Sequence, residues 1–179
     1  VGTANIAVSE MSLALAQDHG IVLTFILHFY CDQDNTARHF AQQNLNPTHV
    51  SDKMEHRSFA TNSYHCSKCS CNHSCPESGI DIYVAGFPCN PWTRRGSRLG
   101  WDHPDILPFK IGFKTVKKLQ PALWLYEVSE GVDDHVAGAA ETGLAQIQAY
   151  VKQVLGNSYM ITIARPVDPT WFGFPIRRP

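Results

Sequence analysis

The sequence has 179 residues, of which 44% are hydrophobic and 17% charged, so its length suits one globular domain and its composition excludes a disordered chain. The formal net charge of −1 argues against a self-sufficient DNA-binding protein, because such proteins carry a basic surplus. No secretory signal is visible, and the longest apolar stretch, 21–31, is too short to span a bilayer. We therefore expect an intracellular protein that does not enter a membrane, nuclear if its source is a eukaryote. Both ends are interpreted as cuts within a longer sequence, since the chain lacks an initial Met and stops just after Arg177 and Arg178.

Strand-like and helix-like segments alternate along the chain, which is typical of an α/β domain with a mostly parallel sheet. Apolar periodicity and end signals predict helices over 9–17, 35–45, 106–119 and 139–155. β-Branched and aromatic residues predict strands over 21–30, 80–85, 122–128 and 159–164. Asp34 is expected to cap the helix over 35–45 through its side-chain oxygen. Ligands of such sheets bind at the carboxyl ends of the strands, where we expect both Cys89 and Glu127.

The segment 58–79 is polar, rich in Cys and without periodicity, and we expect it to be a surface loop. Within it lie four thiols flanked by two imidazoles, namely Cys66, Cys69, Cys71, Cys75, His65 and His73. Without a secretory signal these thiols are expected to be reduced, and both ligand types suit zinc. The spacing is tighter than that of paired Cys-x-x-Cys fingers, so a zinc site and an uncommitted loop both stay open.

A rigid turn with a cysteine at its centre follows the predicted strand over 80–85, and its sequence is Gly-Phe-Pro-Cys-Asn-Pro. The run from Val84 to Gly96 resembles the motif Gly-Phe-Pro-Cys-Gln-Pro-Phe-Ser, with a following Gly, of the C5-cytosine-specific DNA methyltransferase family. The run from Leu125 to Val132 is similar to that family's Glu-Asn-Val-x-Gly-Leu motif. This resemblance implies that Cys89 is a nucleophile and that Glu127 is the acid that meets the cytosine ring.

The chemistry of cytosine methylation explains why these two residue types are needed. Carbon 5 of cytosine is a weak nucleophile, and a thiolate that adds at carbon 6 activates it. A carboxyl group beside ring nitrogen 3 stabilises the charge that develops there. Taken alone, a Cys in a turn is more often structural, and a Glu at a strand end more often faces solvent. The order of strand, Cys turn, helix, strand and Glu favours the catalytic interpretation of Cys89 and Glu127.

Other stretches resemble the same family in the same order. They imply S-adenosylmethionine as cofactor, with Asp32 at its ribose hydroxyls, Asp52 at its adenine amino group, and Gly2 and Pro88 also beside it. The family's Gly-rich cofactor loop would fall on residues 2–7, where only the first glycine remains. The run 173–178 is similar to Gly-x-Pro-Gln-x-Arg, which places Arg178 in the catalytic pocket.

Three arginines, Arg94, Arg95 and Arg98, follow the cysteine turn. They could grip the phosphates of a nucleic-acid strand or simply belong to a solvated loop. The resemblance favours substrate contact, because this loop closes on nucleic acid in the family. Such contacts would help to offset the few kcal/mol that flipping a base out of a duplex costs.

The resemblance covers nearly the whole chain and implies a Rossmann-like, S-adenosylmethionine-dependent methyltransferase fold, with a mostly parallel sheet and helices on both faces. We expect residues 1–179 to form a partial catalytic domain with a Cys-rich insert at 58–79 and without the family's target-recognition domain. The implied function is DNA (cytosine-5-)-methyltransferase activity through a covalent Cys adduct. Three alternatives stay open: methylation of transfer RNA, indicated by Thr93-Arg94, a catalytically degenerate family member, and a zinc-stabilised interaction module.

Overall fold

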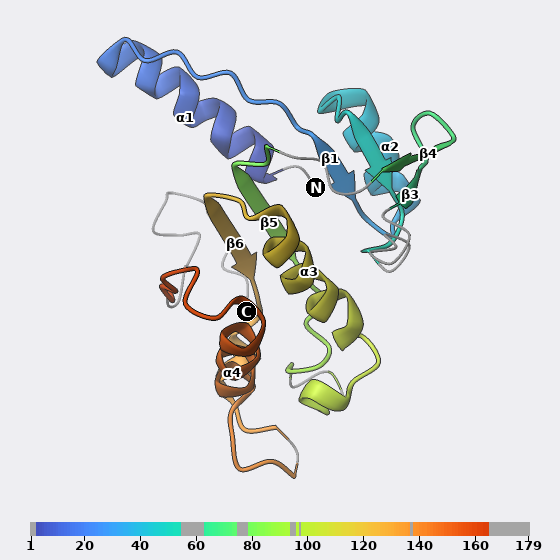
Figure 1. Ribbon diagram of the computed structural model, residues 1–179, viewed down its shortest axis with the longest axis vertical. Coiled ribbons are helices and arrows are strands. Elements are labelled where there is room, and N and C mark those ends of the chain that lie inside the picture. Colours follow the sequence, from blue (N-terminus) through green and yellow to red (C-terminus); the bar gives the residue numbers. More distant parts are fainter. Residues whose placement is uncertain are drawn as a thin grey trace. The chain divides into compact units, whose positions relative to one another are not determined.

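The computed structural model describes residues 3–54, 63–74, 79–93, 96, 98–136 and 138–164. It is a mixed α/β chain of helices and short strands (Figure 1). The chain divides into two compact units. The first consists of Val1–Phe87 with Leu107–Glu127, and the second of Pro88–Ile106 with Val128–Pro179.

Two pairs of parallel strands define the first unit. Strand β1 (Phe29–Cys31) pairs with β2 (His49–Ser51), and helix α2 (Asn35–Asn44) connects them. Strand β5 (Ile82–Gly86) pairs with β6 (Leu123–Glu127), and helix α3 (Ile106–Leu119) lies between them in the chain. The prediction of an α/β chain with parallel pairing is therefore confirmed, while the described strands form separate two-stranded sheets and not one continuous sheet.

Helix α3 buries an aromatic face against strand β6. Phe109 and Phe113 recur at helical spacing and are almost fully buried. The Phe113 ring lies 4.4 Å from that of Tyr126 and 5.5 Å from that of Trp124, measured between centroids. Pro121 follows the helix and cannot continue it, so α3 has the bounds that the sequence predicts. The opposite face of β5–β6 exposes Ile82, Val84, Leu123 and Leu125 instead of carrying a second helix within the described part of the unit.

Helix α2 packs on the β1–β2 pair through the small residues Ala37 and Ala41, both buried. Its N-cap is Asp34, whose carboxylate accepts a hydrogen bond from the Thr36 backbone N–H at 2.7 Å. The predicted cap is thus confirmed. Val50 of β2 lies fully buried beneath this helix layer.

The second unit is built around Trp92 and helix α4 (Gly143–Leu155). Thr142 caps α4 by accepting from the Ala145 N–H at 3.2 Å, and α4 buries a face of aliphatic side chains spaced four residues apart. Trp92 is 3% exposed and lies against Gly131 and Gly143, where a Cβ would overlap its backbone or ring. Two short 3-10 helices, η2 (Gly100–Asp102) and η3 (Glu130–Asp133), complete this unit.

Three predicted elements differ from the structure. Of the strand predicted over 21–30 only the end bonds to a neighbour: β1 begins at Phe29, and the Leu27 and His28 carbonyls accept from the next segment, whereas Val22 and Ile26 are about four-fifths exposed, at 80% and 77%. The strand over 159–164 is also wrong, since this stretch forms no ladder and Met160 is 92% exposed. The helix over 139–155 begins only at Gly143, after an irregular stretch. A strand needs a partner to bond with, so composition alone does not create one.

The prediction of a loop at 58–79 is wrong for its described central part. Strands β3 (Ser63–Cys66) and β4 (Cys71–Ser74) form an antiparallel hairpin there. Tyr64 and Cys66 are buried and alternate with exposed His65, which is the period of a half-buried strand.

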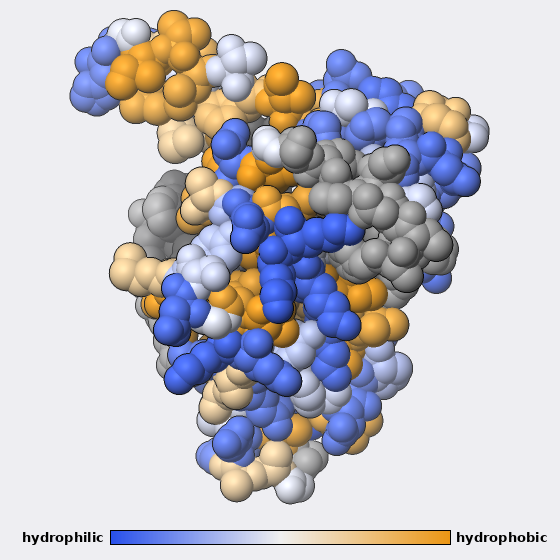
Figure 2. Space-filling view, in the orientation of Figure 1, coloured by the Kyte–Doolittle hydropathy of each residue, from blue (hydrophilic) through white to orange (hydrophobic). Residues whose placement is uncertain are grey.

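Helix α1 (Thr3–His19) contains the predicted helix over 9–17 and extends it toward the N-terminus. Residues 3–7, where a Gly-rich cofactor loop was expected, are therefore helical. Met11 and Leu13 of this helix are exposed, and Figure 2 shows apolar surface over the helix. Among the helices of the described ranges, none has the length and apolar character needed to cross a membrane.

Candidate functional site

The carboxyl end of the β5–β6 pair places Glu127 beside the start of the cysteine turn. The register pairs Gly86, the last residue of β5, with Glu127, the last residue of β6. A Cβ built on Gly86 would lie 3.3 Å from the Glu127 Oε2 atom, so the carboxylate lies directly over this glycine. Glu127 thus occupies the predicted strand end and is exposed to solvent. Two residues, Phe87 and Pro88, separate Gly86 from Cys89.

Phe87, the second residue of the turn, and Tyr126, the residue before Glu127, pack against α3. Phe87 contacts Phe109 and Tyr126, with ring centroids 5.2 Å and 5.0 Å away. Gly112 of α3 faces both rings, because a Cβ there would lie 2.5 Å from Phe87 Cζ and 2.7 Å from the Tyr126 hydroxyl oxygen. This close approach holds the ends of both strands against one helix.

Cys89 lies in a tight turn of the second unit. Its carbonyl oxygen accepts hydrogen bonds from the N–H groups of Trp92 and Thr93, each at 3.0 Å. Asn90, where the family has Gln, donates through its side chain to Asp105 at 3.0 Å. The Cys89 thiol is free and exposed, as a nucleophile that attacks a substrate must be. Cys89 belongs to the second unit and Glu127 to the first.

The carboxyl end of the β1–β2 pair carries Asp32 and Asp52. The register pairs Cys31 with Ser51, and the Asp32 N–H donates to the Ser51 carbonyl at 3.3 Å. Both acids therefore follow the ends of neighbouring strands at one edge of the sheet. The two acids that the family resemblance assigns to the cofactor thus follow neighbouring strand ends.

Asp32 is held by its own loop. One carboxylate oxygen accepts from the Asp34 N–H at 2.9 Å and the other from the Tyr30 hydroxyl at 3.1 Å. Burial, followed by the negative charge of Asp32, raises the pKa of Tyr30 to about 12, so this hydroxyl stays protonated as a donor. Arg38 donates to the Asp32 carbonyl at 2.7 Å and closes the loop from the helix side.

One predicted site residue forms an ion pair within its own unit, and several others lie outside the described ranges. Arg98 forms an ion pair with Asp134 of its own unit at 2.8 Å, with about a third of each side chain exposed, at 36% and 34%. An arginine held this way is less available to a phosphate. Predicted site residues outside the described ranges are Gly2, Cys75, Arg94, Arg95 and Arg178. Pro88, the residue before Cys89 in the chain, is half-buried.

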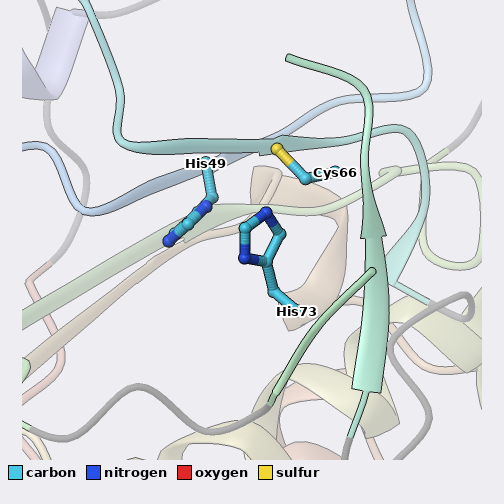
Figure 3. Close-up of side chains that lie close together, drawn as sticks. All are labelled: His49, Cys66 and His73. Atoms are coloured by element: carbon cyan, nitrogen blue, oxygen red, sulfur yellow. The ribbon is translucent and has the colours of Figure 1, made fainter. Parts of the chain in front are cut away.

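A cluster of thiols and imidazoles surrounds His73 of the β3–β4 hairpin. Its Nε2 atom lies 2.9 Å from the Cys69 sulfur and 3.2 Å from the Cys71 sulfur. Figure 3 shows His73 also facing Cys66 and His49, which come from β3 and β2. The ligand atoms of these last three residues lie within 4.8 Å of one another, as do those of Cys69, Cys71 and His73. The described residues of the Cys-rich insert are therefore grouped in a way that suits a metal ion.

Of the two histidines that flank the cysteines in the sequence, His73 belongs to the cluster and His65 does not. His65 points away from it and lies 3.3 Å from the Asn72 side-chain oxygen through Nδ1. His49, which the sequence did not single out, joins it from β2, and its ring centroid lies 4.3 Å from that of His73. No spacing rule connects His49 with the cysteines, because β2 reaches the hairpin through the bonds of Val50 with Cys66 and Ser67.

No protein-family model matches the chain, and comparisons with curated proteins and with solved structures give no match either.

Proposed function

We propose that this chain is the nucleophile-bearing part of an S-adenosylmethionine-dependent cytosine-5 methyltransferase that acts on DNA. The observation that carries the proposal is the register of Gly86 with Glu127. It sets the acid at the base of the Gly-Phe-Pro-Cys turn, in the order and at the strand end that the motif resemblance requires. The Cys89 thiol, free and exposed in that turn, is the nucleophile.

The strand pairings support a Rossmann-like sheet as the fold of this enzyme. In the doubly wound order 3-2-1-4-5-6, the second strand pairs with the third and the fourth with the fifth. β1–β2 and β5–β6 reproduce these two parallel pairings if they are taken as the second to fifth strands. Ligands of such sheets bind at the carboxyl ends of the strands, where the candidate residues lie.

The edge of β1–β2 fits the adenosine part of the cofactor in its hydrogen-bonding chemistry. Ribose hydroxyls and the adenine amino group are donors, and Asp32 and Asp52 offer carboxylate acceptors. An ionised carboxylate has about four lone-pair sites, so the bonds that Asp32 already accepts leave capacity for a ligand. Asp52 accepts from the Lys53 N–H at 2.8 Å through one of its oxygens. These two acids would hold the cofactor, which supplies an electrophilic methyl group when bound.

The chain's own residues would carry the remaining chemistry. The Cys89 thiolate adds to carbon 6 of cytosine, and the electron pair of the 5,6 double bond makes carbon 5 nucleophilic. Glu127 donates a hydrogen bond at ring nitrogen 3 and stabilises the charge that develops there. After carbon 5 has gained the methyl group, it loses its proton to a base, and the Cys89–carbon 6 bond breaks. The thiolate is then restored and the aromatic ring re-forms.

A fluorinated substrate tests this mechanism directly. Release of the enzyme requires loss of the proton from carbon 5, and fluorine at that position blocks this step. The Cys89–carbon 6 bond would therefore persist, and mass spectrometry would detect the adduct. We expect an adduct with duplex DNA that contains 5-fluorocytosine in the presence of S-adenosylmethionine. It should be lost in Cys89→Ala and retained in Cys31→Ser, which removes a half-buried thiol outside the turn.

The same assay separates the alternatives. An adduct with transfer RNA but not with DNA would reassign the substrate. No adduct despite measurable binding of S-adenosylmethionine by calorimetry would indicate a degenerate enzyme and overturn the proposal. An adduct that survives in Cys89→Ala would place the nucleophile elsewhere.

A further inference from the structure

We propose that the β3–β4 hairpin is a zinc site in which Cys66, Cys69, Cys71 and His73 bind one metal ion. This inference does not depend on methyl transfer. Its ligand set also differs from the run of four cysteines that the sequence presents, because His73 takes the central place.

The register of the hairpin places the ligands on one face. Directly paired residues of an antiparallel ladder point to the same side, and so do residues two apart along a strand. Cys66 pairs with Cys71, and Tyr64 pairs with His73. Cys66, Cys71 and His73 therefore share a face, while His65 lies on the other. Cys69 enters from the turn between the strands, and its sulfur already contacts His73.

The distances are close to those that a zinc ion imposes. Zinc binds sulfur at about 2.3 Å and imidazole nitrogen at about 2.0 Å, which separates the two ligands by about 3.5 Å in a tetrahedron. The sulfurs of Cys69 and Cys71 lie 2.9 Å and 3.2 Å from His73 Nε2, so each needs only a small outward shift. The Cys66 sulfur lies within 4.8 Å of a ligand atom of His73, and it must move toward the sulfurs of Cys69 and Cys71 to complete the set.

Hydrogen bonds from neighbouring groups fix the position of the ligands. The Val50 N–H donates to the Cys66 sulfur, with nitrogen and sulfur 3.4 Å apart, and this bond orients the sulfur. Lys68 fixes the turn by donating to the Asn46 side-chain oxygen at 3.0 Å and to the Pro47 carbonyl at 2.6 Å. Cys66 itself is fully buried, which shields the ligand from competing solvent.

His49 is assigned to the outer shell of the site. Its ring packs against those of His73 and Tyr64, with centroids 4.3 Å and 5.8 Å away. His49 belongs to β2 and not to the hairpin. Its contact with the His73 ring positions it to orient that ring. Cys66 is preferred as the fourth ligand because it lies on the hairpin face and has a backbone donor at its sulfur.

The test measures metal binding by the complete chain after treatment with a chelator. Titration with Zn²⁺ against a chromophoric competitor should give one equivalent bound. Substitution with Co²⁺ should give the visible bands of a tetrahedral site and the near-ultraviolet charge transfer of thiolate ligands. His73→Ala and the double variant Cys69→Ser/Cys71→Ser should each weaken binding by at least about 100-fold.

Matched controls make the result specific. His65→Ala removes an imidazole from the other face of the same hairpin, and Cys31→Ser removes a thiol outside it, and both should bind as the parent does. Cys66→Ser should retain some binding but lower the thiolate charge transfer of the Co²⁺ form, a readout that misfolding alone would not give. Absence of a stoichiometric metal ion, or equal losses in His65→Ala and His73→Ala, would overturn the site. Unchanged charge transfer in Cys66→Ser would overturn the proposed ligand set.

Discussion

Replacing Gly112 by alanine sets two opposing energies against each other at one position of α3. Alanine in place of glycine inside a helix stabilises by about 0.8–1.0 kcal/mol. The new Cβ, however, would lie 2.5 Å from Phe87 Cζ and 2.7 Å from the Tyr126 hydroxyl oxygen. Both rings are packed against Phe109, so they cannot simply swing away, and overpacking of this kind costs about 1–3 kcal/mol. We expect Gly112→Ala to destabilise the chain by up to about 2 kcal/mol.

Thermal unfolding followed by circular dichroism measures this effect. For a chain of this length each kcal/mol lowers Tm by about 2–4 °C, so a drop of a few degrees is expected. Lys114→Ala, at an exposed position of the same helix, controls for helix propensity and should leave Tm nearly unchanged. Phe87→Leu removes the crowding carbon, and in that background Gly112→Ala should cost less. A higher Tm for Gly112→Ala alone would refute the tight packing of Phe87 and Tyr126 on α3.

Three further predictions concern the first unit. Phe113→Ala should destabilise by about 3–5 kcal/mol in urea unfolding because the ring is buried, whereas Leu107→Ala, 49% exposed, should change little. The pKa of Tyr30 is raised from 10.0 to about 12, so the stability that its protonated form gives is complete below pH 10 and is lost as the pH rises through 12. Tyr30→Phe should therefore flatten the fall of the urea midpoint over that range, and an unchanged fall would contradict the assigned cause. Asp34→Ala should cost about 0.5–2 kcal/mol through the lost cap of α2, while Asp34→Asn should keep most of it.

Local signals in the sequence predicted the helices well. Helix α3 has the predicted bounds because its apolar residues repeat at helical spacing and Pro121 stops it. Asp34 caps α2 as expected, since a cap is decided by residues within one turn. The strand over 21–30 failed for the opposite reason. Its apolar residues satisfy the pattern of a strand, but pairing depends on a neighbour far away in the chain.

In the candidate site, too, local sequence predicted some features and not others. The position of Glu127 at a strand end follows from its sequence context, and the structure confirms it. The exact partner, Gly86, depends on the register of two separate strands. The sequence did not predict the hairpin at Ser63–Ser74, because each strand has only four residues and the turn lacks the usual glycine. Ser70 takes the left-handed conformation there instead, with φ of 54°.

The bonds between Val50 and the hairpin also make the chain between them a closed loop. The Val50 N–H reaches the Cys66 sulfur across 16 positions of sequence, and the Ser67 N–H returns to the Val50 carbonyl at 2.8 Å. Closing a loop costs an entropy that rises only with the logarithm of its length, about 0.6 kcal/mol for each doubling. Once both ends are fastened, the length of the connection hardly affects stability. This connection is therefore a place where related chains can gain or lose sequence while Asp52, directly after β2, keeps its position.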